Sequence, residues 1–200
     1  MIVISLGGSL LFNGSNGDFN LDYLKELSLV LLKVHAKEGT AVIVGGGRTA
    51  SKYVTAGREF NASEFECDTI AIRVTRMNAR IVAHALGENS VYCQNFQEAE
   101  EATKHGKLPV LGGLLEGITT DAVSMLLAEK AGAKVVANLS AIDYLYSGDP
   151  KMDKTAKKLE KVTHEELTQL AVSGDKRMAR TNFPFDLVAC RLSQRSNVEL

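Results

Sequence analysis

Short apolar runs alternate with longer amphipathic stretches along this chain. Four of the runs are apolar without interruption and rich in β-branched residues, which is typical of strands that a parallel sheet buries on both faces. These runs are Ile2–Leu6 and residues 40–45, 108–113 and 133–139. The pattern predicts four strands within the first 139 residues.

Three amphipathic stretches predict helices that connect or follow these strands. Residues 21–37 carry leucine and valine at i, i+3 and i+4 positions, and residues 68–86 and Thr120–Ala131 have the same period. An alternation of strand and helix predicts right-handed crossovers and the α/β class. We therefore expect a three-layer αβα sandwich around a mainly parallel central sheet.

Two polar stretches separate the predicted elements. Residues 13–18 predict a loop, and residues 147–158 predict a charged, exposed connection at a boundary between two lobes. Residues 197–200 resemble the start of another buried strand. We expect a single domain over residues 1–200, with lobes of about 1–132 and 133–200 and a C-terminus that is shortened relative to a full domain.

The composition is that of an ordinary globular protein, with 45% hydrophobic and 24% charged residues. Lys and Arg number 23 against 24 Asp and Glu, and this balance argues against nucleic acid as a partner. No apolar run approaches the ~20 residues that span a bilayer, so no membrane partner is expected, and the N-terminus resembles a strand more than a signal peptide. The three cysteines are odd in number and scattered, which suggests neither a disulfide framework nor a zinc site and fits a reducing cytoplasm. The four histidines have no metal-ligand spacing.

A glycine-rich turn follows each of three predicted strands, at residues 7–9, 45–47 and 112–113. Ligands of open α/β sheets bind beyond the carboxyl ends of the strands, so these turns are expected along one edge. Glycine lets main-chain N–H groups approach an anion, and a helix N-terminus adds a partial positive charge. Each turn alone is better explained as a tight connection, but three at the same end favour phosphate binding. None has the GxxxxGK[ST] pattern of a P-loop.

Charged and hydroxyl side chains follow two of these turns. Arg48 and Lys52 share one face of the helix after the second turn, which suits a phosphate; a solvated basic face is the alternative. Thr119, Thr120 and Asp121 stand where the helix at 120 begins. They are either a helix cap with a first-turn acid, or ligand-binding hydroxyls with Asp121 orienting a cation such as Mg²⁺.

Several motifs together resemble one family. The strand with its GGS turn, the GGG turn, TTDAV at 119–123 and DYLYSGDPK at 143–151 resemble the amino-acid-kinase superfamily, and within it the archaeal-type uridylate kinases. TRMNA at 75–79 resembles the family's helix beside the acceptor, and the similarity extends from Ile2 to about Val198. The resemblance implies a cytoplasmic enzyme that phosphorylates UMP to UDP with ATP and Mg²⁺ in pyrimidine biosynthesis. It also implies homo-oligomers, commonly hexamers.

Carried over by position, the resemblance assigns roles to individual residues. Residues 1–132 would bind the acceptor and residues 133–200 would bind ATP. The ATP contacts would be Gly8, Ser9, Gly47, Ser51, Ser140, Ala141, Tyr146 and Asp149. The acceptor contacts would be Gly46, Asp68, Leu114, Leu115, Glu116, Gly117, Ile118, Thr119 and Thr120. The catalytic candidates are Asp121, Arg48 and Lys52.

Two of these assignments have alternatives in the residues themselves. Asp68, placed at a predicted helix start, either accepts hydrogen bonds from sugar hydroxyls or only caps the helix. Tyr146 either stacks on a purine or packs in the core.

One position departs from the superfamily. Many members carry lysine two residues before the first glycine, where it neutralises the transferring phosphoryl group, and this chain has Ser5 there. The archaeal-type uridylate kinases also lack that lysine. Because phosphoryl transfer depends on positioning and electrostatic stabilisation, we expect Mg²⁺ together with Arg48 and Lys52, or with Lys176 or Arg177, to supply the charge.

Two other hypotheses stay open. One is a kinase of the same fold with another phosphorylated acceptor such as isopentenyl phosphate, although the GGG turn lacks the histidine expected in that enzyme. The other is a non-catalytic nucleotide-binding protein, suggested by Ser5, Ala141, Tyr144 and the short C-terminus. Production of ADP separates the enzyme from the binding protein.

Overall fold

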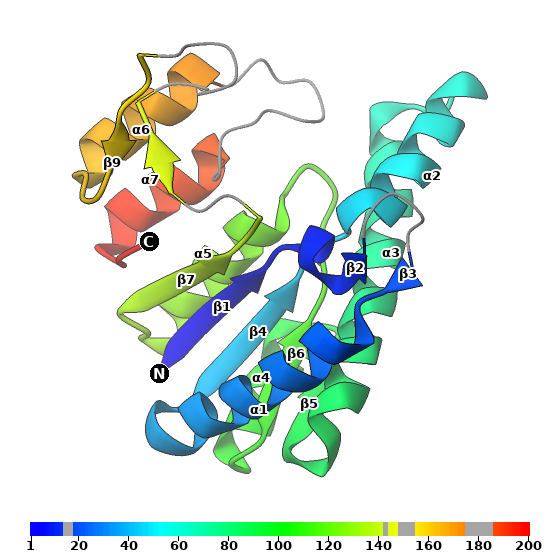
Figure 1. Cartoon of the computed structure of the whole chain (residues 1–200), viewed down its shortest axis with the longest axis vertical. Helices are drawn as coiled ribbons and strands as arrows, with labels where there is room; N and C mark the ends of the chain where they lie inside the picture. The colour runs from blue at the N-terminus through cyan, green and yellow to red at the C-terminus, as the bar shows by residue number, and fades with distance from the viewer. Residues whose placement is uncertain (14–17, 142–143, 148–154, 175–185) are drawn as a thin grey trace.

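The computed structural model describes residues 1–13, 18–141, 144–147, 155–174 and 186–200. Its centre is a five-stranded sheet in the order β5-β6-β4-β1-β7, in which all neighbouring strands are parallel (Figure 1). The strands are β1 (Ile2–Leu6), β4 (Thr40–Val44), β5 (Ser90–Tyr92), β6 (Leu108–Leu111) and β7 (Val135–Leu139). The predicted parallel sheet is confirmed. The predicted strands at 40–45, 108–113 and 133–139 were each one or two residues too long, and the three-residue β5 was not predicted.

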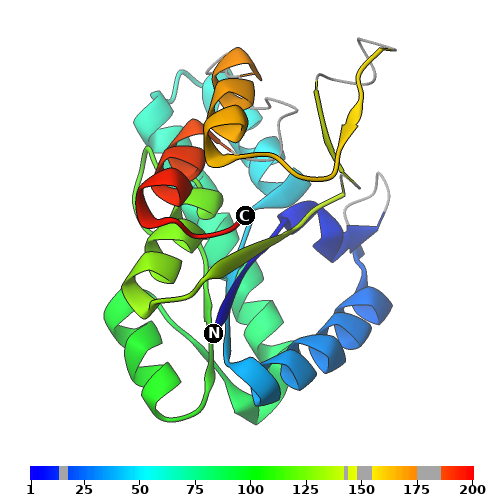
Figure 2. The same ribbon diagram turned by 90° about the vertical axis from the view of Figure 1, so that its left-hand side faces the viewer.

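Helices cover both faces of the sheet, which gives the predicted three layers (Figures 1 and 2). Val42 and Val44 join the core beneath α1 and α3, whereas Ile43 joins the core beneath α4, α5 and α7, because successive strand residues point to opposite faces. None of the helices described here is long and apolar enough to cross a membrane. The helices are α1 (Leu21–Glu38), α2 (Gly47–Glu59), α3 (Glu64–Leu86), α4 (Phe96–Lys104), α5 (Thr120–Ala131), α6 (His164–Gly174) and α7 (Leu187–Ser196).

Helix α3 begins earlier than the apolar period predicted. Ser63 and Glu66 form a capping box, in which Ser63 Oγ accepts the Glu66 N–H and the Glu66 carboxylate accepts the Ser63 N–H at 2.8 Å. The predicted start at Asp68 was therefore wrong, and Asp68 lies in the second turn of α3. This position excludes the interpretation of Asp68 as a helix cap.

Two predicted loops contain short antiparallel ribbons. Asn13 pairs with Asp18, so both ends of the first predicted loop belong to strands, whereas in the second loop only the last residue, Lys158, does, by pairing with Tyr146. Two-residue strands have no period from which they can be predicted. Residues 14–17 and 148–154 lie outside the described part of the chain. The ribbons are formed by β2 (Phe12–Asn13) with β3 (Asp18–Phe19) and by β8 (Leu145–Tyr146) with β9 (Lys158–Leu159).

The last residues lie along β7, at the edge of the sheet. Glu199 forms an isolated parallel bridge with Val135, and the Val136 N–H donates to Glu199 O at 2.8 Å. Val198 is buried. The prediction that residues 197–200 begin a strand is confirmed only to the extent of this one bridge.

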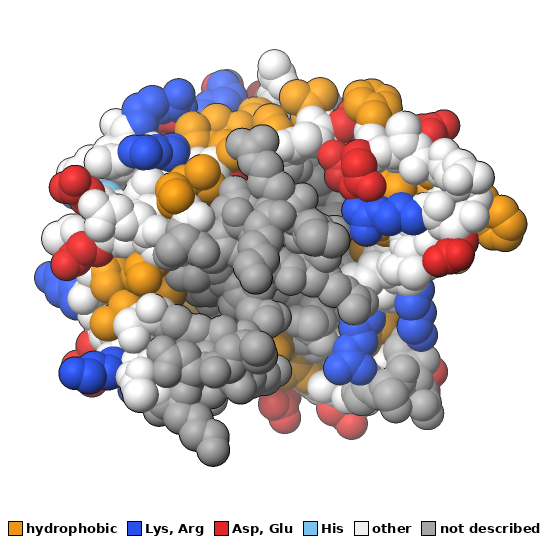
Figure 3. Space-filling model, turned by 90° about the horizontal axis from the view of Figure 1, so that it is seen from above, with side chains coloured by type: hydrophobic (Ala, Val, Ile, Leu, Met, Phe, Trp, Pro, Cys, Tyr) orange, Lys and Arg blue, Asp and Glu red, His pale blue; other side chains and the backbone are white. Residues whose placement is uncertain are grey.

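The carboxyl ends of three strands meet at one edge of the sheet. Leu6 at the end of β1 pairs with Val44 at the end of β4, and Ile43 pairs with Leu111 at the end of β6. A glycine-rich turn follows each of these ends, as the sequence predicted. Figure 3 looks down on this side of the molecule, where basic and acidic side chains are both visible among the described residues.

Candidate functional site

The first two glycine turns touch each other where β1 and β4 end. A Cβ atom on Gly8 would lie 2.4 Å from both Gly45 O and Gly47 N, and one on Gly47 would lie 2.5 Å from Gly8 C. Neither position has room for a side chain. Gly47 also has a φ of 61°, which favours glycine. The two turns form a backbone-lined cradle, with the exposed Ser9 directly after Gly8.

Helix α2 begins at this glycine cradle without a side-chain cap. Gly46 is its N-cap residue, and in the described part of the chain this end of α2 has no side-chain cap hydrogen bond. Uncapped N–H groups and the helix dipole make such a position suitable for an anion. Arg48 and Lys52 lie on the first two turns of α2 and are exposed. Ser51 Oγ donates to Gly47 O at 3.3 Å, so this hydroxyl bonds the backbone of its own helix.

The third glycine turn is explained by packing against α3. A Cβ atom on Gly112 would lie 2.7 Å from Arg76 N. The Gly113 N–H donates to Thr75 Oγ1 at 2.7 Å, and Thr75 donates to Ile72 O at 2.7 Å. Contacts with α3 therefore account for both glycines of this turn without an anion.

The segment at 114–120 is fastened to α3 by side chains. Asp68 accepts the Gly117 N–H at 2.8 Å, and Thr69 Oγ1 donates to Glu116 Oε1 at 2.8 Å. The Thr69 hydrogen bond is the main reason that the pKa of Glu116 lies below its ordinary value. The structure thus brings Asp68 to the segment that the sequence assigned to the same ligand.

Two side chains of the TRMNA motif also bond the backbone of the site, and no role was predicted for either. The Arg76 guanidinium donates to the carbonyls of Gly113 and Leu114 at 3.0 and 3.2 Å. Asn78 Nδ2 donates to Gly45 O at 2.9 Å. Helix α3 therefore orients both the second glycine turn and the start of the 114–120 segment. The TRMNA motif was visible in the sequence, but the carbonyls that Arg76 and Asn78 bond are 33 to 38 residues away along the chain, so the sequence did not reveal these contacts.

The rest of the 114–120 segment is divided between core and surface. Leu114 and Ile118 pack against the core beneath α5, whereas the Leu115 side chain is 56% exposed. Gly117 is exposed and has a φ of 77°. The Leu115 side chain and the backbone of the segment at Gly117 are therefore accessible to a ligand.

The Asp121 carboxylate is held between β1, α5 and β7. Ser5 Oγ donates to Asp121 Oδ1 at 2.6 Å, and Asn138 Nδ2 donates to the same oxygen at 3.4 Å. Burial raises the pKa of Asp121 to about 6; the Ser5 hydrogen bond opposes this rise and the charge of Asp186 adds to it. Ser5, at the position of the superfamily's lysine, is therefore a hydrogen-bonding partner of Asp121.

Thr119 meets a residue that the sequence analysis did not identify. Its Oγ1 accepts the Ala122 N–H at 3.1 Å, as expected of a helix cap, and its hydroxyl donates to Asp186. An aspartate before an apolar run signals a helix start, but nothing in the sequence places Asp186 beside Thr119. The alternative cations Lys176 and Arg177 lie outside the described residues.

The residues expected around the adenosine are described in part. The Gly7 N–H donates to Leu139 O at 2.8 Å, and a Cβ atom on Gly7 would lie 3.6 Å from the Cα of Ser140. Ser140 is therefore beside the first glycine turn, and Ala141 after it is exposed. Tyr146 is partly buried in the β8–β9 ribbon. Asp149 lies outside the described residues.

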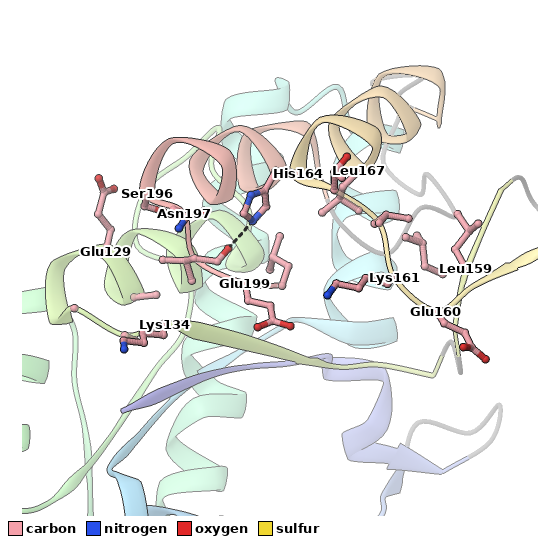
Figure 4. Close-up of a pocket in the computed structure, with 18 residues that line it drawn as sticks. Glu129, Lys134, Leu159, Glu160, Lys161, His164, Leu167, Ser196, Asn197 and Glu199 are labelled. Atoms are coloured by element: carbon pink, nitrogen blue, oxygen red, sulfur yellow. Dashed lines mark hydrogen bonds between the residues drawn. The ribbon is translucent and has the colours of Figure 1, made fainter.

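A separate cavity of about 1140 Å³ opens near the C-terminus. It is bounded by the end of α5, the start of α6 and residues 196–200, and His164 Nε2 lies 3.1 Å from Val198 O at its wall (Figure 4). None of the residues assigned to ATP or to the acceptor lines this cavity. The glycine cradle, and not the cavity, is therefore the candidate site for phosphate chemistry.

Comparisons with known proteins agree with the geometry of the cradle. Residues 1–199 match the amino acid kinase family. The chain is 39% identical to a uridylate kinase from Methanospirillum hungatei, over 100% of this chain and 83% of that protein. The crystal structure of uridylate kinase from Archaeoglobus fulgidus matches with a TM-score of 0.85 at 34% identity, covering 98% of this chain and 87% of that one. The aspartate kinase of Synechocystis, with a TM-score of 0.73, 17% identity and coverage of 98% and 36%, shares the fold alone.

Proposed function

The chain belongs to the amino acid kinase family, and on this premise we propose that it is a uridylate kinase, which transfers the γ-phosphoryl group of ATP to UMP to give UDP in pyrimidine nucleotide biosynthesis. The 39% identity to a protein of that name over the whole chain carries the proposal. The contact between Gly8 and Gly47 supports it, because the two turns provide a backbone cradle where the strands end.

In this proposal the chain acts by positioning two phosphates. Gly8 and Ser9 face the phosphates of ATP, and Gly47 lies between donor and acceptor. The acceptor is a phosphate oxygen of UMP, which is ionised near neutral pH because the second pKa of a phosphate monoester is about 6. No general base is needed, so the chain contributes alignment and electrostatic stabilisation.

Magnesium fits this site as a companion of the nucleotide. Among the described residues, no group of three or more His, Cys, Asp or Glu side chains could hold a metal ion. Mg²⁺ commonly binds through substrate phosphates with few protein ligands, and it neutralises charge on the phosphoryl group. Arg48 and Lys52, exposed on the first turns of α2, supply the chain's own positive charge in place of a lysine at Ser5.

The proposal extends to domains, assembly and location. An acceptor-binding lobe comprises about residues 1–132 and an ATP-binding lobe about 133–200. The enzyme is cytoplasmic and acts on UMP and ATP without nucleic acid or membrane. It is a homo-oligomer, a hexamer by family resemblance. Phe60 (86%), Phe65 (66%) and Met77 (66%) are exposed apolar residues, whose surface self-association would bury.

Replacement of Asp68 is expected to weaken acceptor binding selectively. Asp68→Ala removes the acceptor of the Gly117 N–H and so loosens the middle of the 114–120 segment, which Thr69 and Arg76 still hold at its start. We expect the KM for UMP to rise about tenfold, with kcat within about threefold of the wild type, because a charged hydrogen bond contributes about 1.5–3 kcal/mol. Steady-state kinetics with varied UMP at saturating Mg·ATP measure both constants.

Glu64→Ala is the matched control for this prediction. Glu64 is an exposed carboxylate of the same helix and pairs with Arg58. Its loss should leave both constants unchanged. An equal rise of KM in both variants, or a fall of kcat without a rise of KM in Asp68→Ala, would contradict the role given to Asp68.

The proposed function is tested by ADP release from Mg·ATP with UMP, CMP, AMP and isopentenyl phosphate offered separately. We expect UMP to be the preferred acceptor. Turnover only with another acceptor would retain the kinase and reject UMP. Tight nucleotide binding without ADP release would identify a non-catalytic binding protein.

A further inference from the structure

The N-terminal caps of two helices meet beside the candidate site. Thr119 caps α5 through the Ala122 N–H at 3.1 Å. Asp186 caps α7 and accepts the N–H groups of Val188 and Ala189 at 2.7 and 3.1 Å. The two caps are joined to each other, because the Thr119 hydroxyl donates to Asp186 Oδ2. Helices α5 and α7 lie side by side (Figures 1 and 2).

This cap-to-cap bond connects the two proposed lobes. Thr119 stands near the end of the 114–120 segment, whose middle is held to α3 by Asp68. Asp186 belongs to the C-terminal lobe. A hydroxyl that donates to a carboxylate makes a stronger bond than one between neutral groups, and its simultaneous acceptance of the Ala122 N–H strengthens it further. The bond therefore fixes the segment at a second point, relative to the other lobe.

Asp186 also acts on the site through its charge. Asp186 is the titratable group whose charge adds to the raised pKa of Asp121. Among the described residues, the groups that hydrogen-bond to Asp121 through its side chain are the hydroxyl of Ser5 on β1 and the amide of Asn138 on β7. The Cys190 thiol on α7 also feels Asp121 and Asp186, but burial raises its pKa to about 12, so it stays uncharged near neutral pH. The charge of Asp186 therefore raises the pKa of Asp121, whereas the hydrogen bond from Ser5 lowers it.

We propose that Asp186 is a positioning residue for phosphoryl transfer, which holds Thr119 and the end of the 114–120 segment in register with the ATP-binding lobe. This inference rests on the proposed function. It concerns alignment, since Asp186 acts through Thr119 and Asp121. Alignment matters because a displacement of about 1 Å costs about 100-fold in rate.

Three variants separate the cap from the connection. Asp186→Ser keeps a good N-cap for α7 but is too short to reach Thr119. Asp186→Asn removes the charge; its single oxygen keeps the cap on Val188 and Ala189, and its amide nitrogen faces Thr119 and donates to that hydroxyl, so a bond to Thr119 is kept with its direction reversed. Thr119→Val removes the hydroxyl with little change of shape, and with it both the connection to Asp186 and the α5 cap bond from Ala122. Asn95→Ser, a change of the α4 cap beside β5 at the opposite edge of the sheet from β7, is the matched control for an altered cap.

Kinetics with UMP and Mg·ATP provide the first test. We expect Asp186→Ser and Thr119→Val each to lower kcat/KM for UMP by about tenfold or more, and the double variant to be no worse than the poorer single variant, because both remove one connection. Asn95→Ser should retain the wild-type value. Wild-type kinetics in Asp186→Ser, or independent losses that multiply in the double variant, would overturn the proposal.

The pH dependence of kcat/KM provides a second test, because a merely structural role of Asp186 would leave it unchanged. Asp186→Asn removes a charge that raises the pKa of Asp121, so the acidic limb of kcat/KM should move to lower pH. The substrates titrate in the same range, but their contribution is identical in both enzymes and cancels in the ratio. An unmoved acidic limb would exclude the influence of Asp186 on Asp121.

Hydrogen exchange keeps the inference testable if UMP is not the substrate. In Asp186→Ser the amide of Ala122 should exchange faster, because Thr119 loses its second partner. An effect confined to Val188 and Ala189 would show that Asp186 caps only its own helix, and would overturn the proposal. Failure of ADP release with UMP in the wild type would instead reject the proposed function, and this result is independent of the exchange result.

Discussion

Gly47→Ala is expected to lower kcat/KM for UMP by at least about 100-fold. The added Cβ would lie 2.5 Å from Gly8 C and O and 2.9 Å from Ser9 N, so one of the two turns must shift. The atoms that the added Cβ would meet are all backbone atoms, so no flexible side chain can rotate away to make room. A shift of this kind displaces the N–H groups proposed to hold the ATP phosphates. ADP release measures the loss, and the melting temperature shows how much fold is retained.

Gly132→Ala separates this clash from backbone strain. Gly132 has a φ of 66°, close to the 61° of Gly47, but a Cβ there would meet nothing within 4 Å. Both variants bear the cost of a left-handed alanine, about 1–2 kcal/mol, while only Gly47→Ala closes the cradle. Equal turnover in the two variants would show that the cradle does not bind the transferring phosphate.

Asp121→Asn is expected to stabilise the fold while it abolishes most activity. Burial raises the pKa of Asp121 from 3.8 to about 6. Between these values the folded chain binds a proton that the unfolded chain has lost, so stability falls as the pH rises from about 4 to about 6, and the full cost remains above pH 6. Asparagine removes this cost and still accepts from Ser5.

At pH 7 the free energy of unfolding of Asp121→Asn should therefore exceed that of the wild type by up to about 2 kcal/mol, and the gain should vanish near pH 4. Turnover should fall by about 100-fold or more, as when a preorganised electrostatic group is removed from an active site. Denaturant unfolding at the two pH values and ADP release measure the two effects. A buried carboxylate that destabilises the fold is typical of a functional site.

Asp22→Asn tests the alternative that Asp121 only complements a helix dipole. Asp22 is likewise an acid in the first turn of its helix, α1, but it is exposed and pairs with Lys25. Its replacement should change stability by no more than about 0.5 kcal/mol and leave turnover intact. If Asp121→Asn behaves like Asp22→Asn, Asp121 has no role beyond its helix.

The glycine turns show which part of the site can be predicted from the sequence. Apolar runs identify parallel strands, and the carboxyl ends of parallel strands share an edge, so residues directly after the runs must come together. The contact of Gly8 with Gly47 follows from this rule. The same rule was misleading for Gly112, whose lack of a side chain is explained by the close approach of α3 and not by an anion.

Helix α3 shows a second kind of failure. Its apolar period placed the start at Asp68, whereas the capping box of Ser63 and Glu66 starts it at Glu64. The capping residues were visible in the sequence, but an apolar period carries no information about polar first turns. The correction mattered for function, because it removed the helix-cap interpretation of Asp68.

By itself, the sequence determined four of the five strands of the buried sheet, the helices that follow residues 20, 63 and 119 in approximate extent, and the edge at which the glycine turns lie, since each depends on a local pattern of apolar residues and glycine. Only the tertiary structure decided which partner each polar side chain meets. Ser5 and Asp121 are 116 residues apart, Thr119 and Asp186 are 67 apart, and Asp68 and Gly117 are 49 apart. Such pairs depend on how whole elements pack against one another. Hydrogen bonds between residues far apart in the chain produce no periodic pattern in the sequence from which they could be predicted.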